Sequence, residues 1–329
     1  MFKTKLTILC IAVLIGIFTA CGNVVTEDNT EETISVDQPT EVVQTDVSKT
    51  LAEDEEALVA TYPSQFTQET YTDSETGLAI TYNLYLPKDY DASKSYPMVV
   101  FIADSSCTGK EATVSLTQGR GALVWATEEW QSAYPTIVAV PTYPETILDD
   151  HSGHTTTEYV ELTKRYIDYM SSEYAVDTNR IYGTGQSMGC MTTMLLASEY
   201  PDLYAACMLV DGQWDVQALE GLVNQPFIYF AAEDDQSAWS GAQEVMAMFD
   251  SKSEAYTYAQ WDGNWTIDEL SDAAQSLFSD DENQYFVSWA CGSIEADAGG
   301  GNNGSYHMAS FDYAYNCVDA MEWLFKQSR

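Results

Sequence analysis

The segment 185–189, Gly-Gln-Ser-Met-Gly, places one serine between two glycines. An apolar strand precedes it, and a run suited to a helix follows from Cys190 to Ser198. A serine on such a strand-to-helix turn is exposed, and the free N–H groups of the new helix point toward it. The pattern predicts Ser187 as a nucleophile. It also predicts the backbone N–H of Met188 as one donor to the oxyanion formed during acyl transfer.

A serine nucleophile needs a base, and this chain has three histidines. His151 and His154 precede the serine, so only His307 fits the order serine, acid, histidine. His307 follows a glycine- and asparagine-rich loop and precedes a helical run over 311–325. We therefore predict His307 as the general base.

The acid that orients the histidine is expected directly after a buried strand. Residues 226–232 are short, apolar and aromatic-rich, as such a strand requires, and three acids follow. We favour Asp235, because hydrolases often place this acid three residues after a small residue that ends this strand. Asp234 is the second candidate, and Asp211, after the strand 206–210, is a third.

The second oxyanion donor is expected from the loop after the strand 98–103, and we predict the N–H of Ser105. Asp104 is unexpected there, because a carboxylate near a forming oxyanion raises the barrier. We expect it to point away or to pair with a cation such as Lys110.

Neither a metal nor a cofactor is expected. His151 and His154 resemble a metal pair, with Asp149 and Asp150 beside them, but we interpret the segment as a surface loop near the cleft. Five cysteines lie beyond residue 21 with no Cys-x-x-Cys pair. One bridge, Cys291–Cys317, and buried free thiols both fit.

Strand and helix patterns alternate from residue 79 onward, which predicts an α/β fold with a mainly parallel, eight-stranded sheet covered by helices on both faces. The expected strands lie near 79–86, 97–103, 136–140, 179–183, 206–210, 226–231, 256–260 and 284–288. The expected helices lie near 121–133, 155–174, 188–199, 237–250, 266–278 and 310–326.

Several segments resemble the secreted α/β-hydrolases of the peptidase and carboxylesterase group related to polyhydroxybutyrate depolymerases and feruloyl esterases. They are the entry strands 82–90 and 96–101, the approach to the serine at 176–182, the segment around His307, and the C-terminal run 323–327. The resemblance covers about residues 66–329. It implies the α/β-hydrolase fold and a triad of Ser187, Asp235 and His307.

The chain departs from that family at two places. The usual His-Gly after the third strand is Ala103-Asp104 here, which affects the oxyanion loop. A second small residue after the serine motif is Cys190 rather than glycine, a change that a helix tolerates.

The first residues have the pattern of a targeting segment. Lys3 and Lys5 precede an apolar run from 6 to 18, which is too short for a membrane span. Small residues then lead into Cys21, as in the lipobox of bacterial lipoproteins. We predict a signal peptide over 1–20, lipidation of Cys21, a disordered acidic linker over 21–65, and a catalytic domain over 66–329.

Composition limits the partners. The formal net charge of −38 argues against nucleic-acid binding and disfavours acidic substrates. We expect an extracytoplasmic serine hydrolase of carboxylic esters, attached to the bacterial membrane only by its lipid, that acts on small or polysaccharide-linked esters. The alternatives are a serine peptidase of the same fold and a substrate-binding lipoprotein that has lost catalysis.

Overall fold

The computed structural model describes residues 54–151, 153–280, 282–296 and 304–329. Within them, one nine-stranded sheet has the order β1-β2-β4-β3-β7-β8-β9-β11-β10. Its strands are β1 (Thr67–Thr72), β2 (Ala79–Tyr85), β3 (Tyr96–Ile102), β4 (Ile137–Thr142), β7 (Val176–Gln186), β8 (Ala206–Val210), β9 (Phe227–Ala232), β10 (Thr257–Trp261) and β11 (Gln284–Trp289). Strand β2 pairs antiparallel with β1 and β4, and the other pairs are parallel. The mainly parallel sheet is confirmed.

All eight expected strands are present, and β1 is a ninth that the sequence did not suggest. Its residues, Thr-Gln-Glu-Thr-Tyr-Thr, are almost all exposed, because β1 is an edge strand with no buried face. Without apolar alternation, such a strand has no signal in the sequence. A short hairpin of β5 (Leu148–Asp149) and β6 (Thr155–Thr156) was also not expected.

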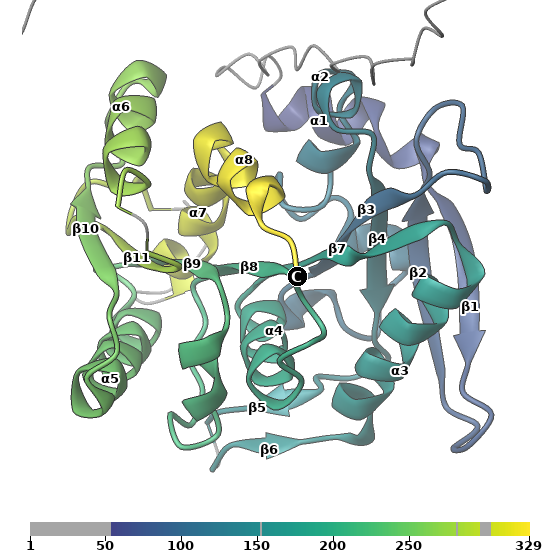
Figure 1. The fold of residues 1–329 in the computed structure, drawn as a ribbon, viewed down its shortest axis with the longest axis horizontal. Helices are drawn as coiled ribbons and strands as arrows, with labels where there is room; N and C mark the ends of the chain where they lie inside the picture. The colour runs from purple at the N-terminus through teal and green to yellow at the C-terminus, as the bar shows by residue number, and fades with distance from the viewer. Residues whose placement is uncertain (1–53, 152, 281, 297–303) are drawn as a thin grey trace, which may run out of the picture. The chain divides into compact units, whose positions relative to one another are not determined.

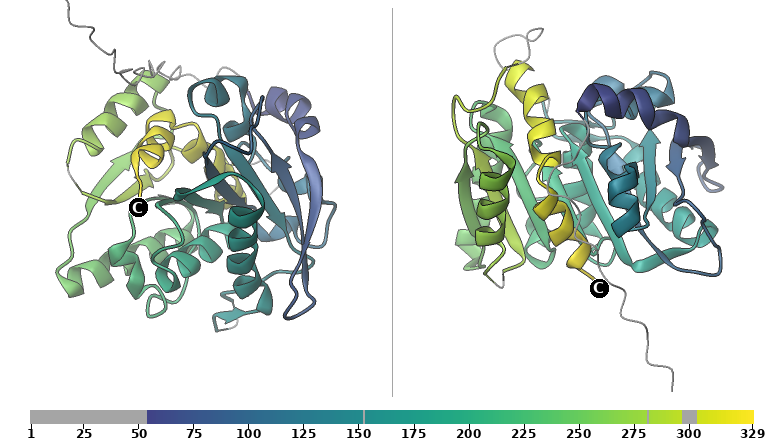
Figure 2. Two further views of the ribbon diagram at one scale, coloured as in Figure 1. Left: turned by 45° about the vertical axis from the view of Figure 1, so that its right-hand side comes forward. Right: turned by 90° about the horizontal axis from the view of Figure 1, so that it is seen from above.

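Helices cover both faces of the sheet, as Figures 1 and 2 show. The helices α1 (Glu55–Thr61), α2 (Glu128–Ala133), α6 (Ile267–Leu277), α7 (Gly304–Tyr315) and α8 (Val318–Lys326) lie on one face, and α3 (Glu158–Glu173), α4 (Met188–Glu199) and α5 (Gln236–Lys252) lie on the other. Successive strand residues point to opposite faces, so β3 sends Phe101 into one core and Val100 into the other.

Two of the expected helices were wrong in extent. The run 121–133 contains a single 3-10 turn at Val124–Ala126 and only then α2, because the Thr127 side chain caps a new helix at the N–H of Trp130. The run 310–326 is two helices, separated where Cys317 leaves the helical conformation with ψ 87°.

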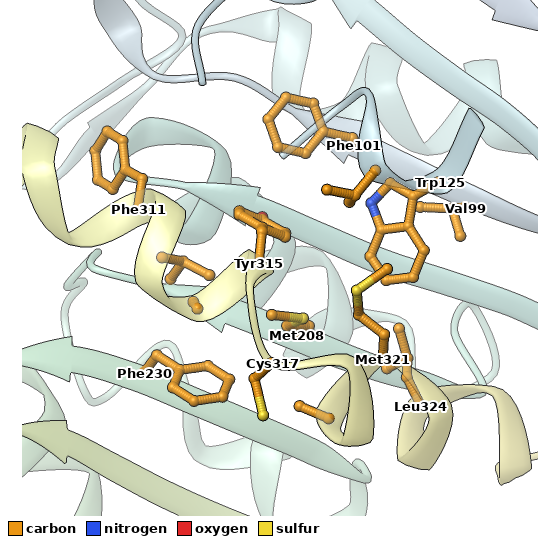
Figure 3. Packing of buried hydrophobic residues seen from close by; sticks show 14 of the residues in the cluster. Val99, Phe101, Trp125, Met208, Phe230, Phe311, Tyr315, Cys317, Met321 and Leu324 are labelled. Atoms are coloured by element: carbon orange, nitrogen blue, oxygen red, sulfur yellow. The ribbon is translucent and has the colours of Figure 1, made fainter. Parts of the chain in front are cut away.

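The break lets both helices bury side chains against the same strands. Figure 3 shows Tyr315 of α7 and Met321 of α8 in one cluster with Met208 of β8 and Phe230 of β9. All four side chains are at most 1% exposed. Helix α7 therefore packs against the sheet through its buried side chains.

The ordered domain begins before residue 66. Helix α1 buries Leu58, and Tyr62 follows in the same core, so the linker expected over 21–65 is wrong for its last twelve residues, 54–65. The expected signal peptide and Cys21 lie outside the described residues. No helix in the described ranges combines the length and apolar character that crossing a membrane requires.

Candidate active site

Ser187 lies on a tight turn between β7 and α4. Its φ of 54° and ψ of −117° are rare for a residue with a side chain. A Cβ at Gly189 would lie 1.8 Å from the carbonyl oxygen of Ile102, so only glycine lets α4 approach the end of β3 this closely. Two backbone hydrogen bonds hold the turn: Ser187 N–H donates to Val210 O at 3.0 Å and Ser187 O accepts from Met191 N–H at 2.9 Å.

The histidine that the chain order selects lies beside this serine. His307 Nε2 is 2.8 Å from Ser187 Oγ, within hydrogen-bonding distance. We expected His307 between a loop and a helix that begins near residue 311; instead it lies within α7, which begins at Gly304. A helical position fixes the backbone that carries the ring more firmly than a loop does.

Asp235 completes a continuous chain of hydrogen bonds. Its Oδ2 contacts His307 Nδ1, the ring nitrogen opposite the serine. Its Oδ1 caps α5 by accepting from the N–H groups of Ser237 at 3.1 Å and Ala238 at 3.3 Å. The carboxylate is thereby fixed at both oxygens, and it is only 3% exposed.

The environment of His307 favours the protonated ring. Burial lowers the pKa of His307, but the hydrogen bond and negative charge of Asp235 outweigh it and raise the pKa above its ordinary value. A base with a raised pKa accepts the serine proton more readily and still releases it to a leaving group.

The two other acids that the sequence offered lie elsewhere. Asp234 hydrogen-bonds at the sheet edge with Cys291 Sγ at 3.0 Å and with the Gly292 N–H. Asp211 is fully buried behind the site, where Ala232 N–H donates to Oδ1 at 2.8 Å and Ser310 contacts Oδ2. Burial, reinforced by the charge of Asp235, raises the pKa of Asp211 to about 7.

The two expected oxyanion donors both stand at the start of a helical turn. Met188 is the first residue of α4, and Ser105 is the first residue of a 3-10 turn over Ser105–Cys107. The first N–H groups of helices have no partner within the helix. No hydrogen-bond acceptor is found for either N–H among the described residues, and Ser105 lines the cavity described below.

Asp104 caps the turn that carries Ser105. Its Oδ1 accepts from Ser106 N–H at 2.8 Å and from Gln118 Nε2 at 3.1 Å. Burial raises its pKa, but these hydrogen bonds outweigh that effect, and the pKa lies below the ordinary value. Asp104 is therefore ionised and held by amide donors; the pairing expected with Lys110 is not among the ion pairs of the described residues.

A cavity of about 600 Å³ opens over these groups. Ser105, Ser187 and His307 line it together with the β5–β6 hairpin. Four carboxylates line it, those of Asp104, Asp149, Asp150 and Asp235. The lining contains no lysine or arginine. The cavity is thus strongly acidic, and it can hold a small ester group.

The remaining sequence candidates lie outside this chemistry. His151 is at the cavity rim and largely exposed, and His154 packs edge-on against Trp214 at 5.0 Å between ring centres. Within the described ranges, no group of three metal-ligating side chains is found. The cysteines 107, 190, 207, 291 and 317 are free thiols, so the bridge considered between Cys291 and Cys317 is not formed.

Three polar residues around the site were missed by the sequence analysis: Gln118, Gln186 and Ser310. Gln118 contacts the oxyanion loop, Gln186 precedes the serine, and Ser310 bridges His307 and Asp211. Amides and hydroxyls of this kind are common throughout the chain. The sequence signal that could have drawn attention was the position of Gln186 inside the serine motif.

Comparison with known proteins places the chain in a family. Residues 74–260, more than half of the chain, match the family described as "Putative esterase". Acetylxylan esterase A of Emericella nidulans is 27% identical over 110 residues, which span 29% of this chain and 36% of that protein.

Solved structures show the same architecture. A thermostable esterase superposes with a TM-score of 0.64 at 26% identity, over 82% of this chain and 64% of its own. The feruloyl esterase module from Clostridium thermocellum superposes with a TM-score of 0.50 at 15% identity, over 80% and 88% of the two chains. The predicted α/β-hydrolase fold is confirmed, and the chain belongs to the esterase family.

Proposed function

We propose that this protein hydrolyses carboxylic esters through an acyl-enzyme on Ser187. The observation that carries the proposal is the unbroken hydrogen-bond chain from Asp235 through His307 to Ser187 at the acidic cavity. Membership of the esterase family supports the ester as substrate. The neighbouring N–H groups of Met188 and Ser105 supply the donors that a tetrahedral intermediate needs.

The first half of the reaction forms the acyl-enzyme. Ser187 Oγ attacks the ester carbonyl carbon as its proton passes to His307 Nε2, and the carbonyl electron pair moves to the oxygen. Met188 N–H and Ser105 N–H stabilise this oxyanion, while Asp235 stabilises the imidazolium. When the oxyanion re-forms the carbonyl, the bond to the alcohol oxygen breaks, and His307 returns the proton to that oxygen.

Water completes the cycle. His307 removes a proton from water as the water oxygen attacks the acyl carbon, and a second oxyanion forms in the same place. Its collapse breaks the bond to Ser187 Oγ, which regains a proton from His307, and a carboxylic acid leaves. Every proton moves through His307, so this sequence needs no other acid or base.

The substrate class follows from the cavity and the relatives. Four cavity carboxylates disfavour esters that carry a negative charge near the reacting carbon. Hydroxyl groups donate hydrogen bonds to carboxylates readily, which suits uncharged small or sugar-linked esters. The names of an acetylxylan esterase and a feruloyl esterase among the similar proteins support the same class.

The test is turnover of p-nitrophenyl acetate by the full-length chain and by Ser187→Ala. The substitution should lower kcat by at least about 10⁴, because it removes the nucleophile while leaving the fold. A fluorophosphonate should label the wild-type chain and not the variant. Full activity in Ser187→Ala, or a preference for amide over ester substrates, would contradict the proposal.

We also propose that the protein is tethered outside the cytoplasm by a lipid on Cys21. The proposal rests on the sequence: two lysines, an apolar run over 6–18 and small residues before the cysteine. Cells that express the chain and grow with labelled palmitate should yield a labelled, membrane-bound protein. Cys21→Ser should abolish the label and release the activity into the soluble fraction, and an unlabelled wild-type protein would refute lipidation.

A further inference from the structure

Gln118 joins the oxyanion loop to the strand that carries the nucleophile. Its Oε1 accepts from Asp104 N–H at 3.1 Å and from Gln186 Nε2 at 2.9 Å. Its Nε2 donates to Asp104 Oδ1 at 3.1 Å and to Ser106 Oγ at 2.8 Å. A primary amide has two hydrogens and two lone-pair positions, so the hydrogen-bonding capacity of this side chain is filled.

The orientation of this amide is fixed by its neighbours. The backbone N–H of Asp104 can only donate, and the ionised carboxylate of Asp104 can only accept. Exchanging the oxygen and nitrogen of Gln118 would therefore set donor against donor and acceptor against acceptor. Gln186 must in turn present its Nε2, since it faces the Gln118 oxygen.

Both ends of this link lead directly to the predicted oxyanion donors. Asp104 precedes Ser105, and Gln186 lies two residues before Met188 and directly before Ser187. Asp104 is 4% exposed and Gln186 is fully buried, so both partners of Gln118 are shielded from water, whereas Gln118 itself is half-buried. The hydrogen bonds of Gln118 to Asp104 and Gln186 are partly shielded from water, and such bonds hold a geometry more firmly than fully exposed ones.

The hydrogen bonds of Gln118 to Asp104 also help to decide which backbone N–H of the loop 104–107 remains free. Asp104 Oδ1 accepts from Ser106 N–H as well as from Gln118, so Ser106 N–H is engaged and Ser105 N–H is not. Without Gln118, the carboxylate of Asp104 would lose one of its donors and its fixed position. It would then be able to turn toward the free Ser105 N–H.

We propose that Gln118 is a positioning residue that sets the Ser105 N–H at the right distance from Ser187 to form the second half of the oxyanion hole. This proposal rests on the function proposed above. Gln118 does not contact the substrate; it acts through Asp104 and Gln186. A shift of about 1 Å in such a donor costs on the order of 10² in rate.

The experiment compares Gln118→Met and Gln118→Glu in the full-length chain. Gln118→Met keeps the length of the side chain and removes all four hydrogen bonds. We expect kcat for p-nitrophenyl acetate to fall by about 10- to 100-fold, while KM changes by less than about twofold. The rate of labelling by a fluorophosphonate should fall by a similar factor, because its phosphoryl oxygen needs the same donors.

Gln118→Glu tests the charge pattern separately. In this variant, a carboxylate oxygen replaces the Nε2 that contacts Asp104 Oδ1. Two carboxylate oxygens can stay in contact only when they share a proton. The activity of Gln118→Glu relative to wild type should therefore recover as the pH falls. This variant also decides the question if Gln118→Met fails to fold.

Gln275→Met is the matched control. Gln275 also bridges a serine and an aspartate, Ser271 and Asp319, but it is exposed and is not among the residues that line the cavity. It should keep wild-type kcat and labelling. If Gln118→Met keeps kcat within about twofold of wild type and loses only thermal stability, Gln118 is structural and the proposal is wrong.

The two proposals fail in different ways. A wild-type chain that is labelled by the fluorophosphonate but does not turn over the ester contradicts the proposed substrate. The effect of Gln118→Met on labelling then still supports or overturns the positioning role. Normal turnover in Gln118→Met overturns the positioning role alone.

Discussion

Asp211→Asn should make the protein more stable at neutral and alkaline pH. Asp211 is fully buried, and burial together with the charge of Asp235 raises its pKa from 3.8 to about 7. The folded state therefore binds a proton between about pH 4 and 7 that the unfolded state has released. The stability that the neutral carboxyl gives is present below pH 4 and is lost as the pH rises through 7.

The magnitude follows from the size of the shift. A rise of about three pKa units corresponds to about 4 kcal/mol at about 1.4 kcal/mol per unit, so ionised Asp211 costs up to about that much. Asparagine can keep both contacts, because its Oδ1 accepts from Ala232 N–H and its Nδ2 donates to Ser310 Oγ. Ser310 can then donate to His307 O, which lies 2.9 Å away.

Urea unfolding at pH 5 and pH 8, followed by tryptophan fluorescence, measures the effect. The free energy of unfolding of Asp211→Asn should exceed that of wild type by far more at pH 8 than at pH 5. Asp202→Asn, an exposed carboxylate outside the site, should leave the wild-type pH dependence unchanged. A difference between Asp211→Asn and wild type that does not change with pH would refute the reasoning.

Three further outcomes concern activity toward p-nitrophenyl esters. Because the pKa of His307 is raised, kcat/KM should rise with pH through a midpoint above 6.5; a midpoint below 6 would contradict this. Asp235→Asn should lower kcat by about 10⁴ and shift that midpoint downward, since it removes the carboxylate that orients and charges the ring. Asp150→Asn should improve kcat/KM for an anionic ester relative to a neutral one by roughly fivefold at low salt, because it removes about 1 kcal/mol of charge repulsion. An unchanged ratio would show that Asp150 does not face the substrate.

The parts of the fold with a strong local signal were predictable from the sequence. The buried parallel strands are continuous apolar runs, and the motif around Ser187 needs its glycines for reasons that act within a few residues. The edge strand β1 has exposed polar side chains, so its existence depends on pairing with β2 rather than on its own pattern. Non-local pairing of this kind leaves no periodicity to detect.

Site geometry depended on contacts between segments far apart in the chain. Chain order alone selected His307, because the other two histidines precede the serine. The choice among Asp211, Asp234 and Asp235 could not be made from composition, since all three follow the ends of buried strands. What separates them is which carboxylate the α5 cap directs toward the ring, and that is set by packing of α5 and α7.

Three buried carboxylates, those of Asp235, Asp211 and Asp104, act electrostatically on the imidazole of His307. The charges of Asp235, Asp211 and Asp104 each favour the protonated form of His307, which the proposed mechanism forms when Ser187 attacks. Any charge that favours the imidazolium also opposes the oxyanion that forms at the same moment. Asp211 limits this conflict, because it is near its midpoint at neutral pH and carries only part of a negative charge. Asp104 stays ionised, because Ser106 and Gln118 donate hydrogen bonds to it. Asp235 is the one carboxylate of the three that hydrogen-bonds the ring, so the imidazolium gains most from its nearest neighbour.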